Sequence, residues 1–186
     1  MSVDLPNPNS IARLEKLAHA SLSLWPMPVD AHARLINIAE NTTWLVEAEG
    51  FRAVLRIHRT GYHSKLGIEQ ELEWSQSLAA AGTVLTPAPI AGHNGEMVQV
   101  GSVTGLHAPR FMVLFEFAPG AQPDENHDLS RPFERLGSIA AAMHLQTIDW
   151  RPAAPLERLI WDDAAVFGAT PTWGSWRGAP NVTPTI

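Results

Sequence analysis

The sequence contains no cysteine in its 186 residues. Disulfide bonds, thiolate-ligated metal sites and a cysteine nucleophile are therefore excluded from any account of its function. Runs of basic residues are also absent, and the formal net charge is -6 at pH 7. Because an acidic surface repels phosphate backbones, and no strand-and-aromatic pattern suited to stacking bases occurs, we expect no nucleic-acid partner.

Long apolar stretches are missing as well. No segment approaches the roughly 18 apolar residues of a membrane span, and the first residues lack a basic region followed by an apolar one. We therefore expect no membrane partner and a cytoplasmic location. Internal repeats and low-complexity tracts do not occur either. With 45% hydrophobic and 17% charged residues, the composition is that of an ordinary globular protein that folds.

Three consecutive segments alternate apolar and polar residues in the way that strands do. They are RLINIAE from Arg34, TTWLVEA from Thr42 and FRAVLRIH from Phe51. Glu49-Gly50 predicts a tight turn between the last two, and Asn94-Gly95 predicts a hairpin further on. The apolar run RFMVLFEF predicts a central strand covered on both faces. Together these segments predict a five-stranded antiparallel sheet.

Helical spacing recurs around these strands. Ser10 can cap a leading helix that ends before Pro26, because proline blocks its continuation. A second helix is predicted over Lys65–Ala81, with Gly82 where a C-terminal glycine belongs. A third helix begins near Pro132, and its apolar face predicts packing against another helix. After it the signal fades, with only a short helix predicted around residues 161–167.

Two opposite charges stand on the apolar sides of neighbouring elements. Arg56 lies between Leu55 and Ile57 in a strand, and Glu71 precedes Leu72 on the helix side that meets the sheet. Burying either charge alone costs several kcal/mol, so an ion pair is the most economical explanation. A cation fixed in this way over a sheet can hold polyphosphate. The alternative, an edge cation and a solvated helix charge that never meet, stays open at this point.

The order of the segments resembles a known family. A loop ENTT, a strand AVLRIHR, a helix with EQELEW, a hairpin, a strand FMVLFEFAPG and a helix LGSIAAAMHLQTIDW follow one another between Ile36 and about Trp176. In this order they resemble the amino-terminal lobe of the aminoglycoside phosphotransferase and choline kinase superfamily, particularly its homoserine-kinase-like and stress-response-kinase-like members.

The resemblance implies an α+β fold in three parts. Residues 1–32 would form a lead and a helix. Residues 33–118 would form a protein-kinase-like small lobe, with the five-stranded antiparallel sheet and one crossing helix. Residues 119–186 would form the hinge and the first helices of an incomplete large lobe.

The resemblance also implies how phosphates would be held. Arg56 would take the place of the strand lysine that contacts the phosphates of a nucleotide, and Glu71 that of its helix partner. Arginine is longer and planar, so the geometry of the pair would differ from that of lysine. Asn41 and Thr42 would belong to the loop that covers the nucleotide.

The adenine ring would be held by a second group of residues. Val54 and the apolar residues of the hinge would enclose the ring. The hinge itself, Glu116, Phe117 and Ala118, would offer backbone C=O and N–H groups to it.

Catalytic and metal-binding residues are not predicted. Phosphoryl transfer needs a catalytic-loop Asp, a following Asn and a further Asp for magnesium, and no His-x-Asp with a suitably spaced Asn occurs in the sequence. Turn or cap roles explain Asp149, Asp162 and Asp163. The eight histidines include no His-Glu-x-x-His helix.

The expected function is therefore that of a nucleotide-binding lobe of an ATP-dependent phosphotransferase acting on a hydroxyl of a small molecule. ATP would be the cofactor, together with magnesium in a complete relative. The chain by itself is expected to be inactive, because positioning without a base or a metal leaves most of the barrier in place. The alternative is a non-catalytic nucleotide-binding or interaction module that docks a partner.

The tryptophans suggest one further property. Trp44 and Trp74 fall in regular elements and are expected in the core. Trp173 and Trp176 have no obvious element to bury them. Self-association through exposed tryptophans is therefore a further hypothesis.

Overall fold

The computed structural model describes residues 8–82, 84–120, 123–124, 126–172, 174–179 and 182. Its contacts divide these residues into two compact units, one from Pro8 to Glu157 and one from Arg158 onward. The first unit contains the sheet and the pocket considered below, and each unit is described by itself.

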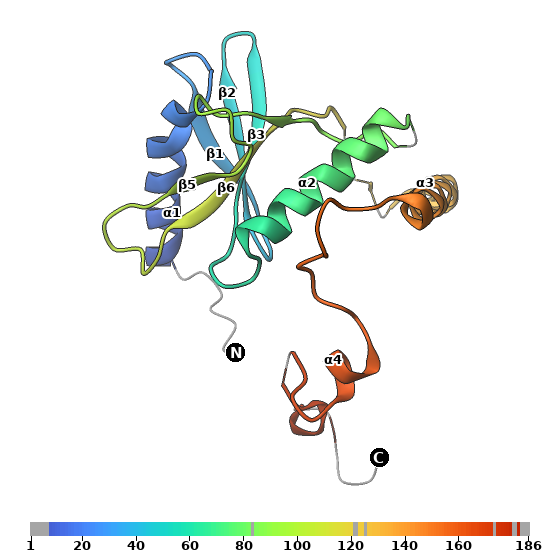
Figure 1. Ribbon diagram of the computed structural model, residues 1–186. Helices are drawn as coiled ribbons and strands as arrows, with labels where there is room; N and C mark the ends of the chain where they lie inside the picture. Colours follow the sequence, from blue (N-terminus) through green and yellow to red (C-terminus); the bar gives the residue numbers. More distant parts are fainter. Residues whose placement is uncertain are drawn as a thin grey trace. The chain divides into compact units, whose positions relative to one another are not determined.

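The first unit is built on one antiparallel sheet of six strands. They are β1 (His32–Ile38), β2 (Thr42–Ala48), β3 (Phe51–Ile57), β4 (Pro89–Ile90), β5 (Gln99–Gly101) and β6 (Arg110–Glu116). Their order is β1-β2-β3-β6-β4, with β5 also paired to β6 (Figure 1). The first three strands form the predicted meander. Gly50, with φ of +69°, occupies the turn between β2 and β3, where a left-handed conformation favours glycine.

The predicted hairpin around Asn94-Gly95 is wrong in its pairing, and this explains why the strand count differs from five. β4 and β5 do not pair with each other, because both pair with β6. β3 pairs with one side of β6. β4 and β5 both pair with its other side, each along a different part of the strand. The turn itself is present, with the Gly92 amide donating to the Glu96 carbonyl at 2.9 Å. A local turn signal cannot decide whether its flanks pair with each other or with a third strand.

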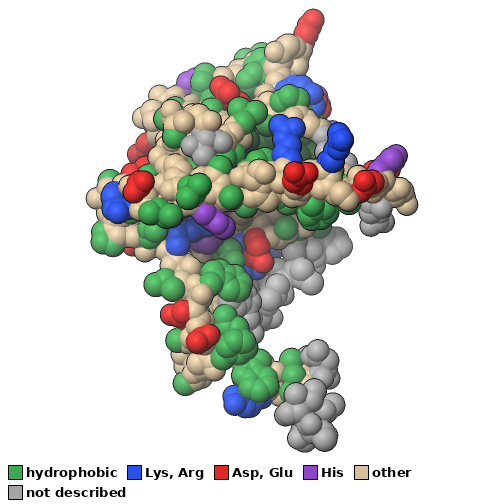
Figure 2. All heavy atoms as spheres, turned by 90° about the vertical axis from the view of Figure 1, so that its right-hand side faces the viewer, with side chains coloured by type: hydrophobic (Ala, Val, Ile, Leu, Met, Phe, Trp, Pro, Cys, Tyr) green, Lys and Arg blue, Asp and Glu red, His purple; other side chains and the backbone are tan. Residues whose placement is uncertain are grey.

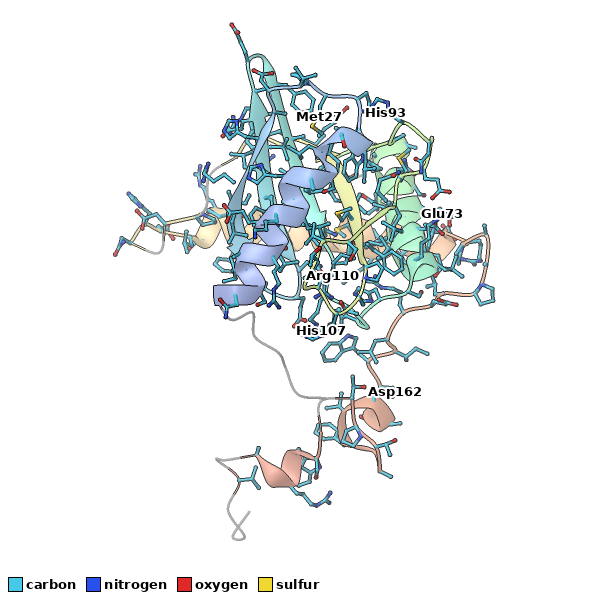
Figure 3. All side chains as sticks on the ribbon, turned by 90° about the vertical axis from the view of Figure 1, so that its left-hand side faces the viewer. Met27, Glu73, His93, His107, Arg110 and Asp162 are labelled. Carbon is cyan, nitrogen blue, oxygen red and sulfur yellow. The ribbon has the colours of Figure 1, made fainter. Side chains whose placement is uncertain are left out.

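One face of the sheet is covered by α1 (Pro8–Ser21), as Figure 1 shows. The helix begins at Pro8, so Ser10 lies inside its first turn, and a 3-10 turn (Leu22–Leu24) follows it. Every second residue of β2 and β3 points toward α1. Met27, labelled in Figure 3, packs against the resulting core. The buried residues of this core include Leu14, Leu17, Ala18, Trp25, Trp44, Val46, Leu55, Ile57, Met112 and Leu114.

Trp25 follows the 3-10 turn and connects it to β4 of the sheet by a hydrogen bond. Its side chain is 1% exposed, and its indole N–H donates to the Ile90 carbonyl at 3.1 Å. We expect Trp25→Phe to lower the free energy of unfolding by about 1–3 kcal/mol, because the partly buried Ile90 carbonyl loses its donor. Urea denaturation followed by circular dichroism measures the change, with Trp161→Phe at an exposed tryptophan as the control. Equal midpoints for the two variants would contradict the prediction.

The other face of the sheet is crossed by α2 (Lys65–Ala80), close to its predicted bounds (Figure 1). The Ser64 hydroxyl caps the helix by accepting from the Gly67 amide at 2.9 Å. Gly82 follows the helix with φ of +64°, the conformation expected of a C-terminal glycine. The helix closes a second buried cluster, formed by Ile68, Leu72, Val98, Val113 and Phe115.

The third predicted helix is confirmed as α3 (Ser130–Asp149). None of its described side chains is fully buried, although Ile139, Ala142 and Met143 are partly buried. Figure 2 looks at the side of the molecule where α3 lies and shows apolar side chains at the surface among charged ones. The contact between α3 and α2 is polar: the Trp74 indole donates to the Thr147 hydroxyl at 3.1 Å. Trp74 is therefore partly exposed rather than a core residue.

The second unit holds α4 (Asp163–Phe167) and a 3-10 turn (Trp176–Gly178). Asp162 caps α4 by accepting from the Ala165 amide at 2.8 Å, so the predicted short helix is confirmed with a later start. Trp176 is exposed, and Trp173 lies outside the described residues. A search of the described residues finds no helix with the length and apolar character to cross a membrane.

Candidate functional site

Arg56 and Glu71 meet in the structure. Nη1 of Arg56 donates to Oε1 of Glu71 at 2.7 Å. Buried residues of β3 alternate with Val54 and Arg56, which therefore face α2. The predicted contact is confirmed, and the alternative in which the two charges never meet is wrong.

The pair orients Arg56 more than it stabilises the fold. The two side chains are 34% and 30% exposed, and an ion pair of this kind contributes only about 0–1 kcal/mol to stability. The guanidinium also lies 5.0 Å from the centre of the Phe115 ring. Carboxylate and ring together hold the guanidinium in one orientation.

A pocket of about 260 Å³ opens beside this pair. Its walls come from β2, β3, α2, the segment before β4, and the end of β6 with the residues that follow. The predicted site residues Val54, Arg56, Glu71, Glu116 and Ala118 are among those that line it. The others are Thr43, Leu72, Ser75, Thr86, Pro87 and Phe115.

The lining divides into a charged part and an apolar part. The charged part comprises Arg56 and the carboxylates of Glu71 and Glu116. The apolar part comprises Val54, Leu72 and Phe115. A ligand that joins an anionic group to a flat apolar ring matches this division. The pocket can therefore bind such a ligand through charge-assisted hydrogen bonds at one end and apolar contact at the other.

Asn41 and Thr42 do not line the pocket. The Asn41 Oδ1 atom accepts from the Arg59 amide at 3.2 Å, and the Thr42 hydroxyl accepts from the Trp44 indole at 3.0 Å. Alternation along β2 turns Thr42 toward the core and brings Thr43 to the pocket instead. The nucleotide-covering role of this loop stays a prediction.

Phe117 is also outside the pocket lining. Its ring lies 3.7 Å from the guanidinium carbon of Arg52, and Arg52 pairs with Glu47 at 3.2 Å. These contacts hold the segment after β6 against the first residues of β3. Ala118, the next residue along the chain, does line the pocket. The role of Phe117 in binding adenine stays a prediction.

Several lining residues were not predicted, and two of them carried a usable signal. Ser75 follows Glu71 by one helical turn, so it shares its face. Thr43 lies opposite Arg56 in the register of β2 and β3. Thr86 and its neighbour Pro87 had no local signal, because the position of Thr86 depends on its hydrogen bond to the Ser75 carbonyl, at 2.9 Å.

Metal ligands are not gathered in this part of the molecule. Among residues 8–182 that the structure describes, no group of three or more His, Asp or Glu side chains is placed to hold a metal ion.

The antiparallel sheet, its crossing helix and the arginine–glutamate pair at this pocket together define the small lobe of a kinase-like phosphotransferase. The chain belongs to the phosphotransferase enzyme family, whose model matches residues 32–177. This range agrees with the span of the resemblance found in the sequence, so membership in that superfamily and the kinase-like α+β fold class are both confirmed.

Two solved structures are similar to this chain. The structure of a microcompartment-associated aminopropanol kinase has 34% sequence identity and a TM-score of 0.79, over 90% of this chain and 51% of that chain. An amicoumacin kinase in complex with AMP-PNP, Ca2+ and Ami shares the fold, with 22% identity and a TM-score of 0.65 over 86% of this chain and 46% of that one. This chain spans about half the length of each, 51% and 46%.

A curated relative extends the comparison in sequence. An uncharacterized protein of Deinococcus radiodurans is 28% identical over 131 residues, which are 62% of this chain and 37% of that protein. The chain therefore corresponds to only part of this longer relative as well.

Proposed function

We propose that this chain is the nucleotide-binding lobe of an ATP-dependent phosphotransferase that acts on a hydroxyl group of a small molecule. The observation that carries the proposal is the Arg56–Glu71 pair, at 2.7 Å, in the wall of a pocket that extends to the segment after β6. A strand cation oriented by a helix carboxylate is the part of a kinase that holds nucleotide phosphates. Family membership supports the same reading.

The nucleotide would span the two parts of the pocket. Arg56 would hold the phosphates, while Val54, Leu72 and Phe115 would enclose the adenine ring. The Glu116 amide already donates to the Ala88 carbonyl at 2.8 Å. We therefore propose that the backbone of Ala118 supplies the donor to adenine.

The proposed acceptor class follows from a relative. The solved structure with 34% identity is described as an aminopropanol kinase, and aminopropanol is a small amino alcohol. A hydroxyl group of a small molecule is accordingly the acceptor that we propose here.

We do not propose that this chain alone catalyses phosphoryl transfer. The described residues gather no group of three or more acidic or histidine side chains, and no catalytic His-x-Asp with a spaced Asn occurs in the sequence. We propose that residues 33–118 bind nucleotide in the cytoplasm and that the 186-residue chain by itself transfers no phosphate.

Calorimetric titration of the whole chain tests the proposal. ATP, adenosine and tripolyphosphate are titrated separately, with and without magnesium. We expect ATP to bind with a Kd at or below about 1 mM, equivalent to about 4 kcal/mol, and more tightly than adenosine or tripolyphosphate. Absence of ATP binding at millimolar concentration would refute it.

A second candidate function is supported by the exposed face of α3. Phe133 and Leu136 near its start and Leu145 and Ile148 near its end are exposed, and exposed apolar side chains can form a protein contact. The lobe would then be an interaction module that docks a partner, or that self-associates with the help of exposed tryptophans such as Trp176. Light scattering across a concentration series tests self-association, and a constant mass would exclude it.

A further inference from the structure

The outer side of α2 is bound by the last turn of α3 and the segment that follows it. Gln70, which is only 3% exposed, makes three hydrogen bonds to it. Its side-chain nitrogen donates to the carbonyls of Ala154 at 3.2 Å and Pro155 at 2.8 Å. Its side-chain oxygen accepts from the Glu157 amide at 2.8 Å. A buried glutamine whose amide is bonded on both sides positions whatever it is bonded to.

Further contacts extend along the helix. Ser64 and the Glu157 carboxylate are hydrogen-bonded at the start of α2, and Glu73, labelled in Figure 3, accepts from the Ala153 amide at 3.3 Å. Toward the end of α2, Ser77 accepts from the Gln146 side chain at 2.7 Å. The α2 residues of these contacts recur every three or four positions, so they form one stripe of the helix. We call residues 146–157 the strap.

Gly67 shows how closely the strap approaches. A Cβ atom at this position would lie 2.7 Å from the Glu157 carbonyl oxygen, which is shorter than a carbon–oxygen contact allows. A glycine inside a helix costs stability relative to alanine. The close approach of the strap is the physical reason for a glycine here.

The strap and the pocket act on adjacent residues of α2. Gln70 faces the strap and Glu71 contacts Arg56. The hydrogen bond from Arg56 to Glu71 tolerates little displacement, because such bonds weaken steeply with distance and angle. A roll or shift of α2 that freed Gln70 would therefore also separate Glu71 from Arg56.

We propose that the strap fixes the orientation of α2 and thereby keeps Glu71 on Arg56, with Gly67 and Gln70 as positioning residues of the pocket. The consequence for ATP rests on the proposed function, whereas the effect on the Arg56–Glu71 pair does not. A segment beyond the hinge would in this way control the strength of the phosphate site, through contacts with residues of the helix other than the one that pairs with Arg56.

The test compares two glycine-to-alanine variants of the full chain. Gly67→Ala forces the strap away from α2. Gly137→Ala in α3 is the matched control, since its Cβ would meet nothing within 4 Å. Gln70→Met, which keeps the side-chain volume and removes the hydrogen bonds, is the second test variant should Gly67→Ala fail to fold.

Two measurements are made on each folded variant. The first is the NMR signal of the Arg56 guanidinium without ligand, assigned by its loss in Arg56→Ala. We expect it to shift or broaden in Gly67→Ala and Gln70→Met and to stay unchanged in Gly137→Ala. The second is calorimetric affinity, which we expect to fall about tenfold for ATP, the equivalent of one well-placed hydrogen bond, and to change less than about twofold for adenosine.

The outcomes separate the two proposals. An unchanged Arg56 signal in the folded test variants overturns the role of the strap, as does an equal loss of ATP and adenosine affinity. If the unsubstituted chain binds no ATP, the proposed function fails, and the Arg56 signal still decides whether the strap positions the pair.

Discussion

Arg56→Ala is expected to weaken ATP binding by about ten- to a hundredfold. Hydrogen bonds that involve a charged group contribute about 1.5–3 kcal/mol, and each 1.4 kcal/mol is a factor of about ten in affinity. The substitution also leaves the Glu71 carboxylate in the pocket without its 2.7 Å partner, where it repels phosphate. Both effects act in the same direction, so this is the largest change in binding that we expect from one substitution.

The ligand series makes this prediction specific. Adenosine carries no phosphate, so its affinity should change by less than about twofold in Arg56→Ala, whereas that of tripolyphosphate should fall with that of ATP. Arg34→Ala is the matched control, because it removes the same charge at an exposed position of β1 outside the pocket lining. Calorimetry on the full chain measures all three ligands. A parallel loss of ATP affinity in the control would show that net charge, not the site, is responsible.

Glu71→Gln tests the partner separately. Glutamine keeps a hydrogen-bond acceptor for Arg56 but removes the negative charge, so Arg56 stays in place while repulsion of phosphate decreases. We expect a smaller change in ATP affinity than in Arg56→Ala. A loss as large as that of Arg56→Ala would mean that the charge of Glu71, rather than the position of its oxygen, orients the guanidinium.

Leu114→Ala is expected to lower the free energy of unfolding by about 2–5 kcal/mol, the cost of a large-to-small change in a core. Leu114 is 0% exposed and lies on β6 between Leu55 of β3 and Ile90 of β4. Its side chain therefore joins the meander to the divided edge of the sheet. Since whole domains are stable by only about 5–15 kcal/mol, the variant should unfold at a much lower urea concentration.

A strand valine provides the control for this change. Val100 of β5 is 51% exposed, so Val100→Ala should alter stability by no more than about 0.5 kcal/mol. Urea denaturation followed by circular dichroism compares the two variants with the unsubstituted chain. Similar midpoints for Leu114→Ala and the unsubstituted chain would contradict the position of Leu114 in the core.

The elements of the fold could be predicted because their signals are local. β2 and β3 begin at the predicted residues Thr42 and Phe51, and α2 begins at Lys65, as its periodicity indicated. Period-two and period-3.6 patterns depend on neighbours in sequence, which the chain itself supplies. The divided edge of β4 and β5 could not be found in this way, because a turn signal does not specify the partner strand.

The charged pair of the candidate site could be predicted from the sequence, because a charged side chain on the apolar side of an element needs a partner of opposite charge. Arg56 stands between Leu55 and Ile57, and Glu71 lies beside Leu72, so an ion pair was the most economical expectation. The structure brings the two side chains together. The sequence did not indicate that Thr86 lines the pocket and that Phe117 lies outside its lining. Thr86 enters the pocket through a hydrogen bond to Ser75, and Phe117 stays out of it against Arg52.

By itself, the amino-acid sequence determined the order of strands and helices, the charged pair and the resemblance to a phosphotransferase lobe, because periodicity and uncompensated charge are properties of neighbouring residues. Only the tertiary structure decided which residues close the pocket and how α2 is held from outside. The contacts of Gln70 with the strap join residues 84, 85 and 87 positions apart. Contacts over such separations form only when the whole chain packs, so no local pattern could reveal them.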